Sequence, residues 1–319
     1  MVGLLLLSSL VTAQHSLISQ EGVFNSYADE QQPVLSEDGS RVYFTRGHHE
    51  ANSGKKADPG DIYVSILDDS IGWTSPQHID GSLNNKYYNG IIGFLNKKDL
   101  LLYGTYETST TPTGLKGVSW AREIQAITDY SKAKPMAIKY YKHRSEMNGY
   151  ALSKDGTVLV MSMESYKTVG AEDLYISLWN QQGRYWSEPI HLGSVINTPL
   201  QELSPNLSAD NRHIYFSSNG HSGYGSRDIF VSSRLDDTWT NWSVPKNMGP
   251  EINTEGAEMY FNYYPEHELA VFTSTLNSDG YGDIHFLDLS VEEREEVLEQ
   301  ELILVDTEVQ ESNLAAPLV

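Results

Sequence analysis

A short motif, an aspartate followed by a run of mostly apolar residues, recurs along the chain, and its spacing constrains the fold more than any other feature. The four copies begin at Asp61, Asp173, Asp228 and Asp283. Successive copies lie 112, 55 and 55 residues apart, so the first interval is close to two periods. A copy that has lost its aspartate is expected in that gap, at 117–120. The chain is therefore predicted to contain five units of about 55 residues.

Other sequence columns keep the same period. Turns of the Ser-x-Asp-Gly kind precede an apolar run, and Asp-Gly and Asp-Asn pairs tolerate the positive φ of tight hairpins. These turns lie at 36–39 and 153–156, with a variant at 208–211. A Trp-x-x-Pro element follows in three units, at Trp73, Trp186 and Trp242. Each unit is therefore expected to form four short strands.

Four strands in each unit predict an all-β fold, a five-bladed β-propeller built from four-stranded antiparallel blades. Stacking the blades radially buries both faces of each sheet, and closing the ring leaves few exposed sheet edges. The second unit, about 86–142, is degenerate, and its segment 119–130 is expected to be irregular or briefly helical.

The fifth unit lacks the Trp-x-x-Pro strand, and the N-terminus carries the missing piece. Aligning Pro33 with Pro205 sets 23–26 opposite 195–198. Residues of about 15–20 are therefore predicted to form the outer strand of the last blade, so that the N-terminal strand closes the ring.

The ends of the chain predict export and a boundary. The apolar run 2–13 is too short to span a bilayer and ends at a plausible signal-peptidase site, although a buried N-terminal strand is an alternative. We expect a signal peptide at 1–13, a propeller at 14–290, and an acidic linker or helix at 291–319 that leads into a following β domain. No other segment is expected to span a membrane.

Composition excludes several classes of function. The chain has no cysteine, so disulfides, thiol nucleophiles and thiolate metal sites are excluded. Its formal net charge of −21 repels phosphate backbones, so a nucleic-acid partner is not expected. No cofactor is expected either.

Two columns of acidic residues are candidate functional or structural positions. Glu30, Glu146, Glu202 and Glu258 each lie just before the first strand of a unit, where a ring of carboxylates at the channel mouth could bind a cation or a basic peptide. Alternatively, each glutamate bonds the backbone of a neighbouring blade. The second column is Asp61, Asp173, Asp228 and Asp283, which we expect to accept backbone N–H groups of the preceding loops.

A metal site was also considered in the first unit. His48, His49 and Glu50 lie near Asp58 and Asp61 in sequence, but adjacent histidines cannot share one face of a strand. A solvated loop without a metal is therefore expected there.

The fourth unit carries the strongest family resemblance. Its segments 202–210 (ELSPNLSAD), 214–218 (IYFSS) and 223–230 (GYGSRDIF) resemble the TolB-type, WD40-like propeller repeats. The continuation from Trp242 to Thr254 resembles the propeller region of OmpA-family envelope proteins. The resemblance covers about residues 24–290, and it implies a periplasmic or outer-membrane-associated chain with an envelope protein or a peptidoglycan-associated partner.

From this resemblance we expect a non-enzymatic scaffold that presents its loops to a protein or cell-wall partner. Two alternatives remain open. A propeller that gates substrate access would need an α/β-hydrolase domain, for which the sequence leaves no room. A carbohydrate-processing propeller would need paired carboxylates at a defined separation.

Overall fold

The structure, a computed structural model, describes residues 21–79, 81–106, 117–125, 127–145, 148–276, 278 and 280–289. The predicted signal peptide at 1–13, the predicted outer strand at 15–20, the segment 291–319 and Glu146 lie outside the described residues. Three short 3₁₀ helices occur among the described residues, η1 (Glu21–Val23), η2 (Lys55–Ala57) and η3 (Pro265–His267). No helix in these ranges has the length and apolar character needed to cross a bilayer.

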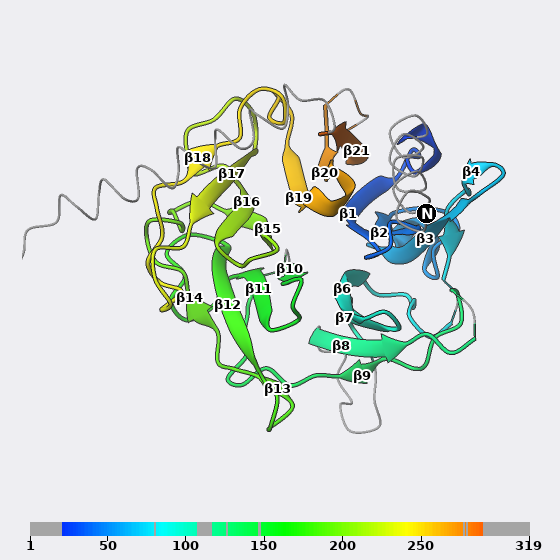
Figure 1. Cartoon of the computed structure of the whole chain (residues 1–319), viewed down its shortest axis with the longest axis horizontal. Helices are drawn as coiled ribbons and strands as arrows, with labels where there is room; N and C mark the ends of the chain where they lie inside the picture. The colour runs from blue at the N-terminus through cyan, green and yellow to red at the C-terminus, as the bar shows by residue number, and fades with distance from the viewer. Residues whose placement is uncertain are drawn as a thin grey trace, which may run out of the picture. The chain divides into compact units, whose positions relative to one another are not determined.

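The described residues form five antiparallel sheets with the fold of a five-bladed β-propeller, which confirms the predicted fold class (Figure 1). The chain divides into two compact units, and the first comprises Met1–Ile138, Asn180–Trp186 and Asn262–Leu287. The second comprises Lys139–Trp179, Ser187–Phe261 and Asp288–Val319.

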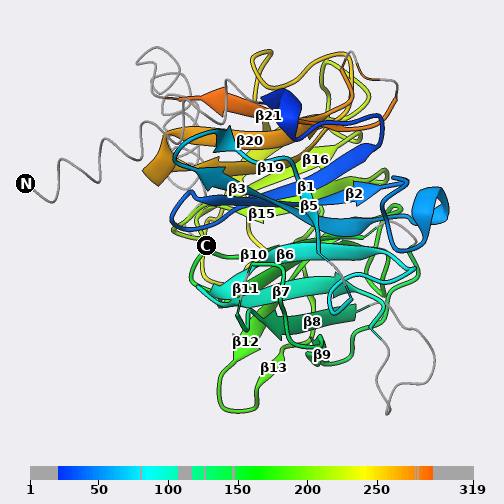
Figure 2. The same ribbon diagram turned by 90° about the vertical axis from the view of Figure 1, so that its right-hand side faces the viewer.

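Three sheets lie mainly in the first unit, and their strands run side by side in Figure 2. The first sheet contains β1 (Asp29–Leu35), β2 (Arg41–Gly47), β3 (Asp61–Asp68), β4 (Gly72–Trp73) and β5 (Gln77–His78). The second contains β6 (Asn89–Asn96), β7 (Asp99–Gly104), β8 (Gly117–Arg122) and β9 (Lys134–Pro135). The fifth contains β19 (Glu258–Tyr264), β20 (Leu269–Ser274) and β21 (Asp283–Asp288).

The other two sheets belong mainly to the second unit. The third sheet contains β10 (Gly149–Leu152), β11 (Val158–Met163), β12 (Asp173–Asn180), β13 (Tyr185–Trp186) and β14 (Ile190–His191). The fourth contains β15 (Glu202–Leu207), β16 (His213–Ser218), β17 (Asp228–Ser233) and β18 (Lys246–Asn247).

The repeated aspartates mark strand starts as the sequence predicts. Asp61, Asp173, Asp228 and Asp283 begin β3, β12, β17 and β21, and Gly117 begins the corresponding strand β8. Of the two expectations for 119–130, the helical one is wrong for the described residues, whereas the irregular one holds after the end of β8. The first four residues of this segment belong to β8, and Glu123 forms an isolated β-bridge with Tyr130.

Apolar side chains between neighbouring sheets form the cores. In the first unit, one cluster joins the first and fifth sheets and includes Phe24, Phe44, Trp73 and Phe286. Another joins the first and second sheets around Tyr43 and Leu102. The second unit has its own cluster, which includes Ile176, Phe216 and Trp242. Within each unit, neighbouring sheets therefore bury apolar side chains against one another, as stacked blades require.

An asparagine after the outer strand holds the third strand of its sheet by both backbone groups. Asn197 accepts the N–H of Leu174 at 2.7 Å and donates to its carbonyl at 3.1 Å. Asn84 and Asn253 hold Ile62 and Ile229 in the same way.

Asn25, from the other end of the chain, performs this task in the fifth sheet. It accepts the N–H of Ile284 at 2.8 Å and donates to its carbonyl at 2.9 Å. Phe24 packs against Phe286 beside this contact, with ring centroids 5.2 Å apart. Asn25 thus corresponds to Asn197, as the alignment of 23–26 with 195–198 predicts.

The first strands of three sheets share a left-handed residue two positions after the glutamate. These residues are Gln32, Ser204 and Tyr260, with φ of 51°, 48° and 57°. In β1 and β15 the pairing register shifts beside this residue, which marks a β-bulge. Non-glycine residues rarely adopt this conformation. Its recurrence at the same position in three sheets therefore marks it as a regular feature of the blades.

Each Ser-x-Asp turn is closed by its aspartate. Asp155 accepts hydrogen bonds from the hydroxyl of Ser153 at 2.6 Å and from the N–H of Thr157 at 3.0 Å. Burial raises the pKa of Asp155, but these hydrogen bonds outweigh burial and hold the pKa below its ordinary value. Asp38 and Asp210 have lowered pKa values for the same reason.

These turns predict a loss of stability in acid. A carboxyl whose pKa is lower in the folded state stabilises the fold above its unfolded pKa of about 4, and this contribution is lost as the pH falls through the folded pKa. The Asp155→Asn variant should therefore be less stable than the wild type at pH 7 and lose less stability on acidification. Urea unfolding at several pH values measures this. An equal loss of stability on acidification in the variant and the wild type would contradict this prediction.

Candidate functional site

The glutamate column closes the loops that lead into the first strands. The carboxylates of Glu30, Glu202 and Glu258 are buried, and each accepts the hydroxyl and the backbone N–H of the residue four positions earlier. The hydroxyl distances from Ser26, Thr198 and Thr254 are 2.6, 2.7 and 2.5 Å. The carboxylates bond their own loops. These three glutamates thus have structural hydrogen-bond partners in their own loops. That the glutamates form a ligand-binding ring remains a prediction.

Burial has an electrostatic consequence for this column. It raises the pKa of Glu202, against the lowering effect of its bonds from Thr198 and Ser218. It also raises the pKa of Glu30, although the positive charge of Arg46 opposes this. Both carboxyl groups therefore hold a proton more strongly than an exposed glutamate does.

The aspartate column orders the loop before each third strand. Asp61, Asp173 and Asp228 are buried, and each accepts a backbone N–H from that loop at 2.5–2.7 Å. Each aspartate also forms a hydrogen bond with one side chain of the outer strand. The partners, in the same order, are His78 at 2.7 Å, His191 at 2.8 Å and Asn247 at 2.6 Å. The aspartates thus join three parts of each sheet. Asp283 begins β21 and is only half-buried.

The first sheet departs from the repeat at Arg46. Its guanidinium donates to Glu30 at 2.6 Å and to the carbonyl of Phe24 at 2.7 Å, and it lies 4.7 Å from the ring centre of Tyr63. In the fourth sheet the corresponding partner of the glutamate is the hydroxyl of Ser218, at 3.0 Å. Residues that repeat from unit to unit are needed to build the blades. A residue found in only one sheet is not required by the repeat and can therefore serve a function of the protein.

Arg46 supports a loop that is also particular to the first sheet, the segment 48–60. Asn52 donates to the carbonyl of Arg46 at 2.8 Å and accepts from the hydroxyl of Tyr63 at 2.8 Å. Asp58 accepts the N–H groups of Gly54 at 2.7 Å and Gly60 at 3.1 Å, and burial raises its pKa. The loop is therefore fixed from within.

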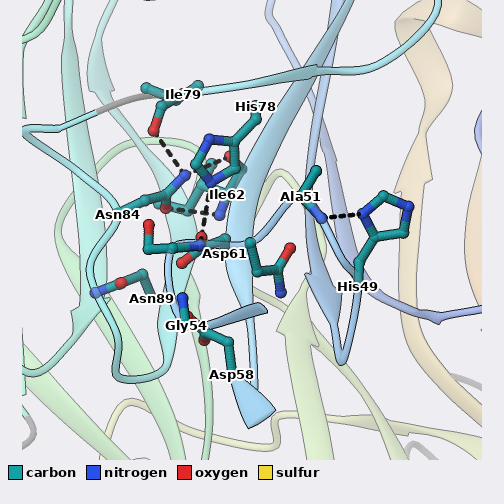
Figure 3. A network of polar contacts seen from close by, with 12 residues as sticks. His49, Ala51, Gly54, Asp58, Asp61, Ile62, His78, Ile79, Asn84 and Asn89 are labelled. Carbon is teal, nitrogen blue, oxygen red and sulfur yellow. Dashed lines mark hydrogen bonds and ion pairs between the residues drawn. The ribbon is translucent and has the colours of Figure 1, made fainter. Parts of the chain in front are cut away.

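Figure 3 shows this network around Asp61 and His78, with His49 beyond it. The ring of His78 meets that of Tyr63 edge-on, with centroids 5.2 Å apart. Among the residues that the structure describes, no group of three or more His, Asp or Glu side chains is placed to hold a metal ion.

Asp29 is the acidic residue of this region that sequence reasoning missed. It precedes the buried Glu30, is itself partly exposed, and begins β1, the edge strand of its sheet. Gln201 and Ala257 stand at this position in the fourth and fifth units. The position before the glutamate varies between units, whereas the glutamate itself repeats. This contrast is the sequence signal that could have identified Asp29.

Asp29 bonds one residue of its own strand and the residue that precedes β21. One carboxylate oxygen accepts the N–H of Gly282 at 2.7 Å, and the other accepts the side-chain amide of Gln31. Burial raises the pKa of Tyr88 to about 12, and the charge of Asp29 raises it as well, so this phenol lies within electrostatic reach. A partly exposed carboxylate with a phenol within electrostatic reach is a combination that can bind a hydroxyl-rich ligand.

Comparisons with known proteins identify the fold but no sequence family. No protein-family model matches the chain, and no curated protein matches it. A glycoside hydrolase superposes with a TM-score of 0.52 at 11% identity, over 82% of this chain and 88% of that one. An α-L-arabinofuranosidase from Lactobacillus brevis gives 0.50 at 11%, over 82% and 91%. TolB from Acinetobacter baumannii gives 0.48 at 11%, over 82% of this chain and 57% of TolB.

These findings correct the prediction of a non-enzymatic chain, which is wrong. That prediction looked for catalysis in a separate hydrolase domain, whereas this propeller fold makes up about nine-tenths of two structures named as enzymes. The expected likeness to OmpA-family proteins finds no support in these comparisons, although TolB is among the structures that share the fold.

Proposed function

We propose that this chain is a carbohydrate-processing β-propeller that acts outside the cytoplasm. The observation that carries the proposal is Asp29, a partly exposed carboxylate on the edge strand β1 that no repeated structural role explains. The likeness of fold to a glycoside hydrolase and an α-L-arabinofuranosidase, at similar length, supports it. The apolar run at 2–13 supports export.

Cleavage of a glycosidic bond uses two carboxyl groups, of which one donates a proton to the leaving oxygen and the other attacks or activates water. We assign the ionised role to Asp29. Asp283 is the candidate for the second role, because it is half-buried and directly follows Gly282, whose N–H bonds Asp29. Tyr88 would hold a sugar hydroxyl beside them.

The test is hydrolysis of a panel of chromogenic glycosides and polysaccharides by the full chain. Asp29→Asn and Asp283→Asn should each lower kcat/KM by about 10²–10⁴ on any substrate that is cleaved. Asp69→Asn is the matched control, since Asp69 is exposed in the turn between β3 and β4.

Circular dichroism and the unfolding midpoint of each variant separate lost chemistry from lost folding. Cleavage that persists at the wild-type rate in folded Asp29→Asn would contradict the assignment. Absence of hydrolysis across the panel by the wild-type chain would count against the function itself. The expected envelope protein or peptidoglycan-associated partner remains a separate prediction.

A further inference from the structure

An exposed aromatic side chain stands beside the loop 48–60. Tyr27 is 53% exposed, and its ring is stacked on that of His49 with centroids 5.2 Å apart and planes 23° from parallel. The ammonium of Lys56 lies 5.6 Å from the centre of the Tyr27 ring. We call Tyr27, His49, Lys55 and Lys56 the Tyr27 platform.

The platform is held in place although it is exposed. His49 accepts the N–H of Ala51 at 3.1 Å, and its ring meets that of Tyr63 edge-on, with centroids 6.1 Å apart. Burial and the charge of Arg46 lower the pKa of His49 below its ordinary value. A ring fixed before binding loses little conformational entropy when a ligand stacks on it.

The backbone of the loop is strained on either side of this surface. His48 and Lys55 have φ of 55° and 58°, a left-handed conformation that is unfavourable for non-glycine residues. The bonds of Asp58 and Asn52 keep the loop in this shape. These hydrogen bonds therefore hold the backbone that carries the two lysines.

The platform is basic in a chain with 43 acidic and 22 basic residues. Lys55 and Lys56 are exposed, and the one acidic side chain of the segment 46–56 is Glu50, which pairs with Lys56 at 3.0 Å. Both partners of this pair are more than 60% exposed, so it contributes little stability and is easily exchanged. An incoming carboxylate can replace Glu50 without a large cost.

We propose that the Tyr27 platform binds an acidic sugar of the uronic acid type within the glycan that the protein processes. The sugar ring stacks on Tyr27, and its carboxylate pairs with Lys56 and Lys55. A stacking face next to a cation suits this class, because a neutral sugar forms no ion pair with the lysines and a simple anion has no ring face to stack on Tyr27. The inference rests on the proposed function and names its substrate class.

The experiment is calorimetric titration of the full chain with trigalacturonate and, for comparison, with neutral galactotriose. The Asp29→Asn variant serves as the parent, so that binding is measured without hydrolysis. Trigalacturonate should bind at least about 10-fold more tightly than galactotriose, and added salt should reduce this difference.

Three further variants locate the binding. Tyr27→Ala should weaken trigalacturonate binding by about 10-fold or more, and Lys56→Gln by about 5-fold. Tyr166→Ala is the matched control, because Tyr166 is 73% exposed and has the Lys142 ammonium 6.0 Å from its ring centre. It should bind as the parent does. If Tyr27→Ala were to misfold, the exposed Lys56→Gln variant would still decide the question.

Equal affinity for the acidic and neutral trisaccharides, or parental binding by Lys56→Gln, would overturn the inference. The two proposals fail separately. Hydrolysis of neutral glycans without trigalacturonate binding would leave the proposed function intact and refute the platform. Trigalacturonate binding that depends on Tyr27, in a wild type that cleaves no glycan, would support the platform as a binding site and refute the proposed function.

Discussion

Replacing Arg46 with methionine should lower the free energy of unfolding by about 3–5 kcal/mol, the usual effect of removing one partner of a buried ion pair. The carboxylate of Glu30 is fully buried and bonds Arg46 at 2.6 Å. Methionine fills a similar volume beside Phe44 and Tyr63 but leaves Glu30 without its counter-charge. The expected cost is therefore electrostatic rather than a loss of packing.

The pH dependence of this variant provides an internal check. The pKa of Glu30 is already raised by burial, and removal of Arg46 should raise it further. A carboxyl whose pKa is raised on folding favours the native state most at low pH and loses that contribution as the pH rises through the folded pKa. The deficit of Arg46→Met should therefore be largest at neutral pH and shrink toward mildly acidic pH.

Urea denaturation of the wild type, Arg46→Met, Glu30→Gln and the double variant measures the pair as a cycle. The double variant should be more stable than Arg46→Met, because it removes the isolated charge. A loss below about 1 kcal/mol in Arg46→Met would contradict the prediction and assign the pair the energy of an exposed one.

The second large effect is expected from Asn25→Ala. This change removes both hydrogen bonds to Ile284, and the two residues are 259 positions apart in the chain. Leaving the backbone groups of Ile284 unsatisfied should cost about 2–4 kcal/mol. The unfolding midpoint should fall by several degrees.

A comparison with Asn84→Ala separates this contact from the local ones. Asn84 makes the same two bonds to Ile62, but within one continuous sheet and over 22 residues. Amide exchange in β21 should accelerate by about 10-fold or more in Asn25→Ala, because the chain end then opens without global unfolding. Asn84→Ala should leave exchange in β21 unchanged. Equal exchange of β21 in both variants would show that Asn25 does not secure the fifth sheet.

The repeat made most of the fold predictable. A spacing of about 55 residues located β3, β12, β17 and β21 at their aspartates, and three of these aspartates, Asp61, Asp173 and Asp228, bond the preceding loop in the same way. The match between Asn25 and Asn197 followed from the same logic. The helical alternative at 119–130 failed because the second unit has lost its sequence markers while its strands still pair with their neighbours.

The candidate site was less predictable, for a related physical reason. A repeat identifies the residues that the units share. It therefore identifies buried residues such as Glu30 but not the neighbouring Asp29, which does not repeat. Arg46 replaces a small hydroxyl found in the fourth sheet, and nothing in the sequence showed that its side chain turns inward to Glu30. The shape of the loop 48–60 depends on bonds from Asp58 and Asn52 that no spacing reveals.

The kink shared by Gln32, Ser204 and Tyr260 has a consequence for protein engineering. Because three first strands adopt one kinked backbone path with three different side chains at the left-handed position, the kink does not require one particular residue there. The fourth sheet, which has all its strands and the kink, is thus a module that could be copied head to tail to build a fully symmetric ring. Such a ring would isolate the architecture from the individual features of the natural protein.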